Sequence, residues 1–522
     1  MPDARDNDRL SWGDALFLYL EREGTPLNIA SVNVFEGAIP LAACRSFIES
    51  KLPLIPRYRQ RIVSPPFNLG LPVWEYDSNF DIRYHVRQIR LKRGTDAELK
   101  AAASKILGRI MDRERPLWDL ILLRGLKGNK TGVIMRVHHC LADGIAGVGL
   151  MNVIMDANPE AHRPTNLRPF RVPRTRDPLT SLVDGFMHSY ANLVDRFLTA
   201  QSDLLTIAQK MLGASRDTTP DQMRRLLPEL ALPTERLRFN VNCHGPQRFI
   251  WAEIPLADVK AMKTACGGTV NDVVLSLVTA TIRRYTEMHG DPVKGRLLRM
   301  MVPVNIRDGR SNDLGNRISL LPVTVPLAIR DPRRLIRAVT RRTEFLKRAP
   351  VAELMSLAGN LVGSTPTALQ AFAGPIASEL PLTVFNLVCT NVPGPAFPLY
   401  LMGHKMLKWY PYVPIGGEMA VNCAILSYNG IMYFGFTGDV HAAPDLGRLE
   451  KLLKLSIQEF EQIVPGSTGA NSQLARPKKP PIPAKVEIHE SASVERNGVS
   501  RIHPGREHRA SHPRMVQAVA AD

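Results

Sequence analysis

The pattern of apolar and polar residues predicts a strand, a loop and a helix in the first third of the chain. Apolar residues alternate with small or polar ones over Ile29–Phe35, which is typical of a strand with one buried face. Gly132–His138 is almost continuously apolar and predicts a fully buried strand. Gly144–Met155 is apolar and rich in small residues, which favours a buried helix. A loop is therefore expected between the strand that ends at His138 and the helix that begins at Gly144. A short amphipathic helix is also expected over Asp14–Glu21.

The second half of the chain has the same mixture of strands and helices. Phe249–Ile254 and Leu297–Val304 predict strands. Val270–Tyr285 predicts a long helix, because Thr269 stands three residues before Asp272 as in a capping box. Further apolar runs predict three strands and a final amphipathic helix, at Leu382–Thr390, Met419–Ser427, Ile431–Thr437 and Leu446–Ile463.

Composition divides the chain into four segments. Residues 1–156 and 247–465 are each expected to form a domain, since 522 residues exceed the size of one ordinary core. Residues 157–246 combine a Pro-rich stretch with an amphipathic helical segment and predict a linker and helical crossover. Residues 466–522 are rich in Pro, Ser, Lys and Arg with little apolar periodicity, so we expect a disordered basic tail.

The charge and the cysteines narrow the class of protein. The formal net charge is +18, so the surface attracts nucleic acid, anionic lipid headgroups or phosphate-bearing substrates such as coenzyme A. Nucleic acid is the least favoured, because neither zinc-finger spacing nor an aromatic RNA-binding motif is present. The six cysteines stand singly, which predicts buried thiols in a reducing compartment rather than disulfides.

The sequence also predicts a cytoplasmic protein without a spanning helix. The N-terminus is polar and lacks the apolar core of a secretory signal. The longest stretch without charged residues or histidine, Leu354–Ser378, contains Pro366 and Pro375 and several glycines, so it is not expected to span a membrane. Two interpretations stay open for it: contact with a membrane surface, or packing between domains.

The candidate chemistry lies at the end of the predicted strand, where His138 and His139 are followed by Asp143 and Gly144. Neutral imidazole accepts a proton near physiological pH, which suits acid–base catalysis. Gly144 would let a substrate approach the backbone, and a buried Asp143 would need a cationic partner. The alternatives are a metal site or two histidines satisfied in the core. Successive residues of an extended chain point to opposite faces, which disfavours a chelating pair, and no metal is expected.

These residues resemble the HHxxxDG motif of the coenzyme A-dependent acyltransferase superfamily, which includes chloramphenicol acetyltransferase and condensation domains. Further segments resemble the bacterial wax ester synthase/diacylglycerol acyltransferase family, and the resemblance covers about residues 10–465. The segments that carry it include Ser11–Leu18, Pro56–Arg61, Pro116–Trp118, Thr269–Asp272, Val302–Arg307, Leu314–Arg317 and Asn391–Pro395.

The resemblance implies a mixed α/β fold of two chloramphenicol-acetyltransferase-like domains, each a mixed sheet flanked by helices, with a substrate channel between them. It implies that His139 is the catalytic base and that His138 shapes the site. It implies that Asp143 holds the loop through an arginine. Two interpretations stay open for Arg57, Arg59 and Arg61: one of them is the partner of Asp143, or the three form a basic surface.

Two further segments are candidates for substrate binding. Asn271 and Asp272 open the predicted helix and can be ordinary caps, whereas the resemblance places them near the active site, where Asn271 would donate to an oxyanion. Pro116, Leu117 and Trp118 are interpreted as core or as the wall of an acyl channel, without a chemical role.

The function implied is transfer of a fatty acyl group from acyl-CoA to diacylglycerol or to a long-chain alcohol, without a cofactor or a covalent intermediate. Such substrates imply peripheral association with a membrane or lipid droplet. The alternatives are an acyltransferase that takes its acyl group from a carrier protein, and a non-catalytic lipid-droplet protein.

Overall fold

The computed structural model describes residues 9–141, 151, 153–160, 233–305, 318–348, 351, 365–377 and 379–465, all of which belong to one compact unit, Met1–Gly469. Most of the predicted helix Gly144–Met155, most of the crossover and the tail 466–522 lie outside these residues, as do Asp143 and Gly144.

The first of two six-stranded sheets has the order β11-β12-β1-β6-β5-β4. Only the β4–β5 pair is parallel, and all the other pairs are antiparallel. A two-stranded sheet is formed by β2 (Gln60–Val63) and β3 (Val73–Tyr76), which come between β1 and β4 along the chain. The strands of the larger sheet are β1 (Asn28–Glu36), β4 (Val86–Arg90), β5 (Trp118–Leu126), β6 (Lys130–His138), β11 (Tyr400–Leu401) and β12 (His404–Tyr412), and the α-helices of this part are α1 (Trp12–Leu20), α2 (Leu41–Lys51), α3 (Ile82–His85) and α4 (Asp96–Leu107).

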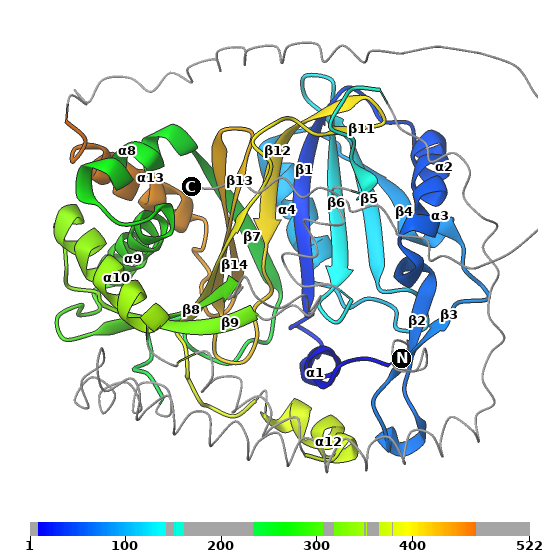
Figure 1. The fold of residues 1–522 in the computed structure, drawn as a ribbon, viewed down its shortest axis with the longest axis horizontal. Helices are drawn as coiled ribbons and strands as arrows, with labels where there is room; N and C mark the ends of the chain where they lie inside the picture. The colour runs from blue at the N-terminus through cyan, green and yellow to red at the C-terminus, as the bar shows by residue number, and fades with distance from the viewer. Residues whose placement is uncertain are drawn as a thin grey trace, which may run out of the picture. The chain divides into compact units, whose positions relative to one another are not determined.

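The second sheet has the order β7-β14-β13-β10-β8-β9, with β10 parallel to both of its neighbours. Four helices gather on one side of it in Figure 1: α8, α9, α10 and α13. The strands are β7 (Gln247–Pro255), β8 (Leu297–Asn305), β9 (Ile318–Pro326), β10 (Leu387–Pro393), β13 (Val421–Tyr428) and β14 (Ile431–Asp439). The helices are α8 (Leu256–Cys266), α9 (Val270–Met288), α10 (Pro332–Arg348), α12 (Thr367–Ala377) and α13 (Arg448–Glu461).

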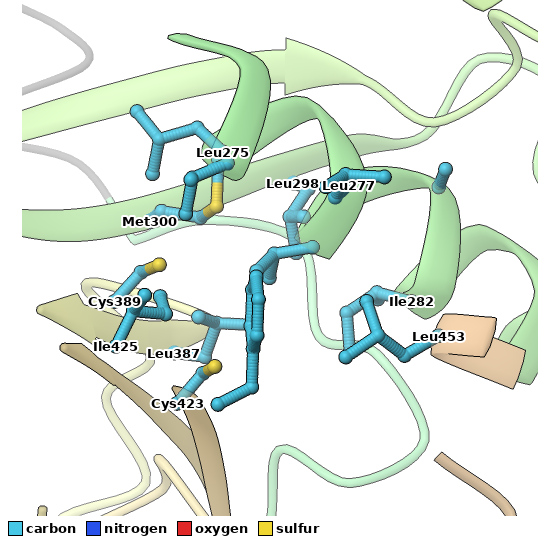
Figure 2. Close-up of a cluster of buried hydrophobic side chains, with 14 of the residues drawn as sticks. Leu275, Leu277, Ile282, Leu298, Met300, Leu387, Cys389, Cys423, Ile425 and Leu453 are labelled. Carbon is cyan, nitrogen blue, oxygen red and sulfur yellow. The ribbon is translucent and has the colours of Figure 1, made fainter. Parts of the chain in front are cut away.

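The core of the second half forms around α9, which is buried on nearly all sides. Figure 2 shows Leu275 and Ile282 of this helix among side chains from β8, β10, β13 and α13. Burial of one such side chain stabilises the fold by roughly 1.5–3 kcal/mol. The helix begins at the predicted capping box, in which Thr269 Oγ1 accepts from the amide of Asp272 and the Asp272 carboxylate accepts from the amide of Thr269.

Most predicted elements are confirmed, and so is the mixed α/β class with helices flanking both sheets. One prediction was wrong at its boundary: β10 begins at Leu387 rather than at Leu382. Leu382 is 53% exposed and lies in irregular structure, so its apolar character does not reflect burial in a strand.

β12 was not predicted, because Lys405, Lys408 and Pro411 interrupt its apolar pattern. This strand comes from the C-terminal part of the chain but pairs with β1 of the first sheet, as Figure 1 shows.

The six cysteines are free thiols, five of them buried, as the sequence predicted. Among the described helices, none is by itself long and apolar enough to cross a membrane. The pair α8 and α9 reaches the necessary length and apolar content together, but it is bent by 99°.

Candidate active site

The histidine pair stands where β6 ends, and its backbone is held on two sides. His138 is the last residue of β6 and lies opposite Asn28 of β1. Its amide donates to the carbonyl of Leu117 (3.0 Å), whereas the amide of His139 donates to the carbonyl of Leu27 (2.9 Å). The two neighbouring segments therefore fix the direction in which each imidazole leaves the chain.

His138 is buried, with 1% of its surface exposed. Its Nδ1 accepts from the backbone amide of Cys140 at 3.2 Å and lies 2.9 Å from the Cys140 sulfur. The other ring nitrogen, Nε2, lies 3.4 Å from Glu21 Oε1. This imidazole has both nitrogens directed at protein groups, so its chemistry is one of positioning.

Glu21 is the carboxylate that organises this part of the site. Its Oε1 accepts from the amide of Leu27 at 2.9 Å, and its Oε2 accepts from Arg113 at 2.9 Å. Burial alone would raise the pKa of Glu21, but His138, Arg113 and the Leu27 amide outweigh burial and hold the pKa below its usual value. Glu21 is therefore ionised at neutral pH and binds the segment that holds His139.

His139, in contrast to His138, is partly exposed. Its ring stacks on Phe17 of α1, with centroids 3.8 Å apart and planes 13° apart. The stack and the Leu27 carbonyl fix the plane and origin of the imidazole. An imidazole that is partly exposed and held in one orientation is suited to take a proton from a bound substrate.

Cys140 follows the histidines but is not a candidate nucleophile. Burial raises the pKa of its thiol well above the usual value, and Asp14 and Glu21 act in the same direction. The thiol therefore stays protonated, whereas cysteine nucleophiles react as thiolates.

A buried ion pair stiffens the strand below the histidines. Arg136 of β6 donates to both carboxylate oxygens of Asp119 in β5, at 3.1 and 2.7 Å. The same guanidinium donates to the carbonyls of Ile106 and Arg109, and Asn28 also donates to Arg109. The end of α4 is thereby fixed to β6 next to the site.

A cavity of about 660 Å3 adjoins this junction. It is lined by α4 and the following Gly108 and Arg109 on one side, and by the start of β7 on the other. Gln247 at the start of β7 donates to the carbonyl of Gly24, which precedes the Leu27 segment. The opening therefore lies between the two halves of the fold, beside the segment that holds His139.

The predicted substrate-binding residues Pro116, Leu117 and Trp118 are all buried. Trp118 donates from its indole nitrogen to the carbonyl of Tyr58 at 2.8 Å. Together with the bond from the His138 amide to Leu117, these contacts describe core packing that positions the histidine loop.

Asn271 and Asp272, the other predicted pair, lie at the start of α9. Asp272 is buried, and besides the capping box it accepts from Thr343 of α10 at 2.7 Å. Asn271 accepts from the side-chain amide of Asn391 at 3.2 Å, at the end of β10. Asp272 thus has the contacts of a cap and of a link to α10, whereas Asn271 is partly exposed and directed toward the strand ends.

The partner of Asp143 stays a prediction, because Asp143 and Gly144 lie outside the described residues. Arg57 stacks over Trp74, and Arg61 pairs with Glu114. Within the described ranges, no three His, Cys, Asp or Glu side chains converge as a metal site would require.

Sequence reasoning missed Phe17 and Glu21. The available signal was weak: Glu21 is a single carboxylate at the end of an apolar helix, four residues after an aromatic one, so both lie on one helix face.

Two family models match the chain. Residues 10–274 match the wax ester synthase/diacylglycerol acyltransferase catalytic domain, and residues 314–461 match the C-terminal domain of the same family. Two proteins of Mycobacterium tuberculosis H37Rv are similar to this chain. The protein named probable diacylglycerol O-acyltransferase tgs1 is 29% identical, and the match covers 81% of this chain and 89% of tgs1. The protein named probable diacylglycerol O-acyltransferase tgs2 is 28% identical, and the match covers 88% of this chain and 99% of tgs2.

Solved structures agree on the fold. The wax ester synthase/diacylglycerol acyltransferase of Marinobacter aquaeolei VT8 superposes with a TM-score of 0.59 at 25% identity, covering 87% of this chain and 99% of that chain. The first condensation domain of the calcium-dependent antibiotic synthetase has a TM-score of 0.53 at 14% identity, covering 88% and 97%. The second likeness concerns the fold alone, and it agrees with the predicted two-domain architecture.

Proposed function

Because the chain belongs to the wax ester synthase/diacylglycerol acyltransferase family, and is therefore an acyltransferase of lipid biosynthesis, we propose that it transfers a fatty acyl group from acyl-CoA to diacylglycerol or a long-chain alcohol, with His139 as general base. The observation that carries the proposal is the contrast between the two histidines. His138 is buried against Glu21 and Cys140, whereas His139 is partly exposed and its ring is held by stacking on Phe17.

The proposed step needs no enzyme-bound intermediate. His139 takes the proton of the acceptor hydroxyl as its oxygen attacks the thioester carbon. The tetrahedral species then collapses to the ester, the carbon–sulfur bond breaks, and the imidazolium returns the proton to the departing thiolate to give free CoA. Removal of a general base typically costs roughly 10²–10⁴-fold in rate.

The proposal includes a lipid surface, because these acceptors are poorly soluble in water. Leu369, Phe372 and Ile376 follow each other at helical spacing on α12, and Phe372 is 73% exposed. Phe67, in the 3-10 turn η4 (Pro66–Asn68), is 85% exposed, and Thr367 at the start of α12 donates to the carbonyl of Asn68 in that turn. Large apolar side chains gathered at a surface are typical of contact with a membrane or another protein.

The position of this apolar surface connects it to the site. A methyl group added at Gly374 of α12 would lie 3.0 Å from the carbonyl oxygen of Tyr19, so α12 packs closely on α1. Phe17 of the same helix α1 stacks on His139. This packing supports the proposal that the protein is cytoplasmic and contacts a membrane or lipid droplet through α12 and η4. An acceptor leaving the lipid there would be one helix away from the base.

The test uses the purified chain with labelled palmitoyl-CoA and either diacylglycerol or hexadecanol. We expect ester from at least one acceptor, a loss of roughly 10²-fold or more in His139→Ala, and full activity in the matched control His441→Ala, which changes an exposed histidine. Palmitoyl-acyl-carrier protein is offered in parallel. Turnover of that donor alone, or equal activity of wild type and His139→Ala, would contradict the proposal.

A further inference from the structure

A second cavity, of about 530 Å3, lies away from the histidines, between the α8–α9 turn and α10. One wall is the turn that joins α8 to α9, Cys266–Gly268, and the other is a face of α10. Asp272, of the pair predicted to bind substrate, is the third residue of α9, which follows this turn, and it accepts a hydrogen bond from Thr343 of α10. The cavity therefore adjoins the predicted substrate-binding segment.

The wall formed by α10 is strongly basic. Of the seventeen residues of this helix, seven are Arg or Lys and one is acidic. Arg334, Arg337 and Arg341 are spaced by three and four residues, so they share one face of the helix, and all three line the cavity. In the described part of the chain, no carboxylate forms an ion pair with any of them.

The opposite wall offers hydrogen-bond donors without partners. The amides of Gly267 and Gly268 make no hydrogen bond to another described residue. Both glycines have positive φ, 75° and 88°, and a methyl group on Gly268 would lie 2.5 Å from Thr340 Oγ1, so only glycine fits there. Thr340 also lines the cavity, and its buried hydroxyl has no hydrogen-bond partner among the described residues.

Such an arrangement is unfavourable for the protein alone. Like charges at i,i+4 destabilise a helix by a few tenths of a kcal/mol per pair, and a buried hydroxyl without a partner adds a further cost. An anion would remove both costs at once, because guanidinium groups and free backbone amides are the groups that bind phosphate oxygens.

We propose that this cavity binds the phosphate groups of the nucleotide end of the acyl-CoA donor, which rests on the proposed function. The thioester and the nucleotide phosphates stand at opposite ends of coenzyme A. The protein can therefore bind the phosphates at α10 while the thioester of the same acyl-CoA molecule lies at His139.

The experiment titrates the full chain with adenosine 3′,5′-bisphosphate by calorimetry. The test variant is Arg337→Gln/Arg341→Gln, and the matched control is Arg90→Gln/Arg93→Gln, which removes the same charge from exposed positions in the first half. We expect the test variant to bind the bisphosphate at least roughly tenfold more weakly, with a matching rise in KM for palmitoyl-CoA and little change in kcat. The control should bind as wild type does.

Unchanged bisphosphate affinity in the test variant would overturn the inference. If that variant also loses binding to phosphatidylglycerol vesicles, the arginines bind lipid headgroups instead. Thr340→Val supplies an independent variant that leaves the helix charges unchanged, and it too should weaken binding of the bisphosphate. If wild type binds the bisphosphate through these arginines but makes no ester, the proposed function fails and the phosphate site stands. If ester forms and no variant changes the KM for palmitoyl-CoA, the phosphate site fails and the proposed function stands.

Discussion

Replacement of Glu21 by alanine should both destabilise the fold and slow catalysis. The carboxylate accepts hydrogen bonds from Leu27 and Arg113 and faces Nε2 of His138. Its removal leaves the buried Leu27 amide without its acceptor, at about 1–3 kcal/mol, and also removes the carboxylate that faces the buried His138 ring. The side chain of Arg113 is 45% exposed and can bind water instead. We therefore expect a loss of about 3 kcal/mol in the free energy of unfolding.

The effect on catalysis follows from the path of these bonds. Glu21 holds the amide of Leu27, and the carbonyl of Leu27 holds the amide of His139. Glu21→Gln keeps one acceptor oxygen and the shape of the side chain, so it should fold while it lowers kcat about tenfold, since small errors in positioning are costly. Glu114→Gln is the matched control, because Glu114 forms only an exposed pair with Arg61.

The pH dependence supplies a second readout. The folded state holds the pKa of Glu21 below the ordinary value of 4.5, so its ionised form stabilises the protein above that pH, and the contribution is lost as pH falls through the lowered pKa. The difference in unfolding free energy between wild type and Glu21→Gln, measured by denaturant titration, should therefore be full at pH 7 and shrink below about pH 4.5. Equal stability and equal kcat of the two proteins at pH 7 would refute the reasoning.

Three further predictions concern the base, the strand beneath it and the lipid surface. His139→Ala should lose roughly 10²–10⁴-fold in kcat whereas His138→Ala keeps more activity, and equal small losses in steady-state assays would place the base elsewhere. Asp119→Ala leaves the buried guanidinium of Arg136 uncompensated and should cost about 3–5 kcal/mol, read as a lower Tm; an unchanged Tm would show that the pair adds no stability. Phe372→Ser should reduce co-sedimentation with anionic vesicles without loss of kcat on dispersed substrate, whereas Leu455→Ser, an exposed apolar residue of α13, should not; an equal effect of both would remove α12 from the proposed surface.

Features that depend on neighbours in sequence could be predicted. The strand that ends at His138 follows from an apolar run, and the start of α9 follows from Thr269 and Asp272 three residues apart.

Features that depend on contacts across the fold could not. Phe17 and Glu21 belong to the site because α1 packs beside the end of β6, more than a hundred residues later in sequence. Arg334, Arg337 and Arg341 are ordinary surface residues in the sequence, and only the packing of α10 against the α8–α9 turn makes them one wall of a cavity.

The place of β12 in the first sheet has a consequence for synthesis of the chain. β1 lies between β12 and β6, so until residues 404–412 leave the ribosome the edge of β1 has unpaired amides and carbonyls. At about 5–20 residues per second, that open edge lasts for many seconds after β6 has been made. A fragment limited to residues 10–274 would keep it permanently, and we expect such a fragment to aggregate through the Asn28–Glu36 strand although it contains both histidines.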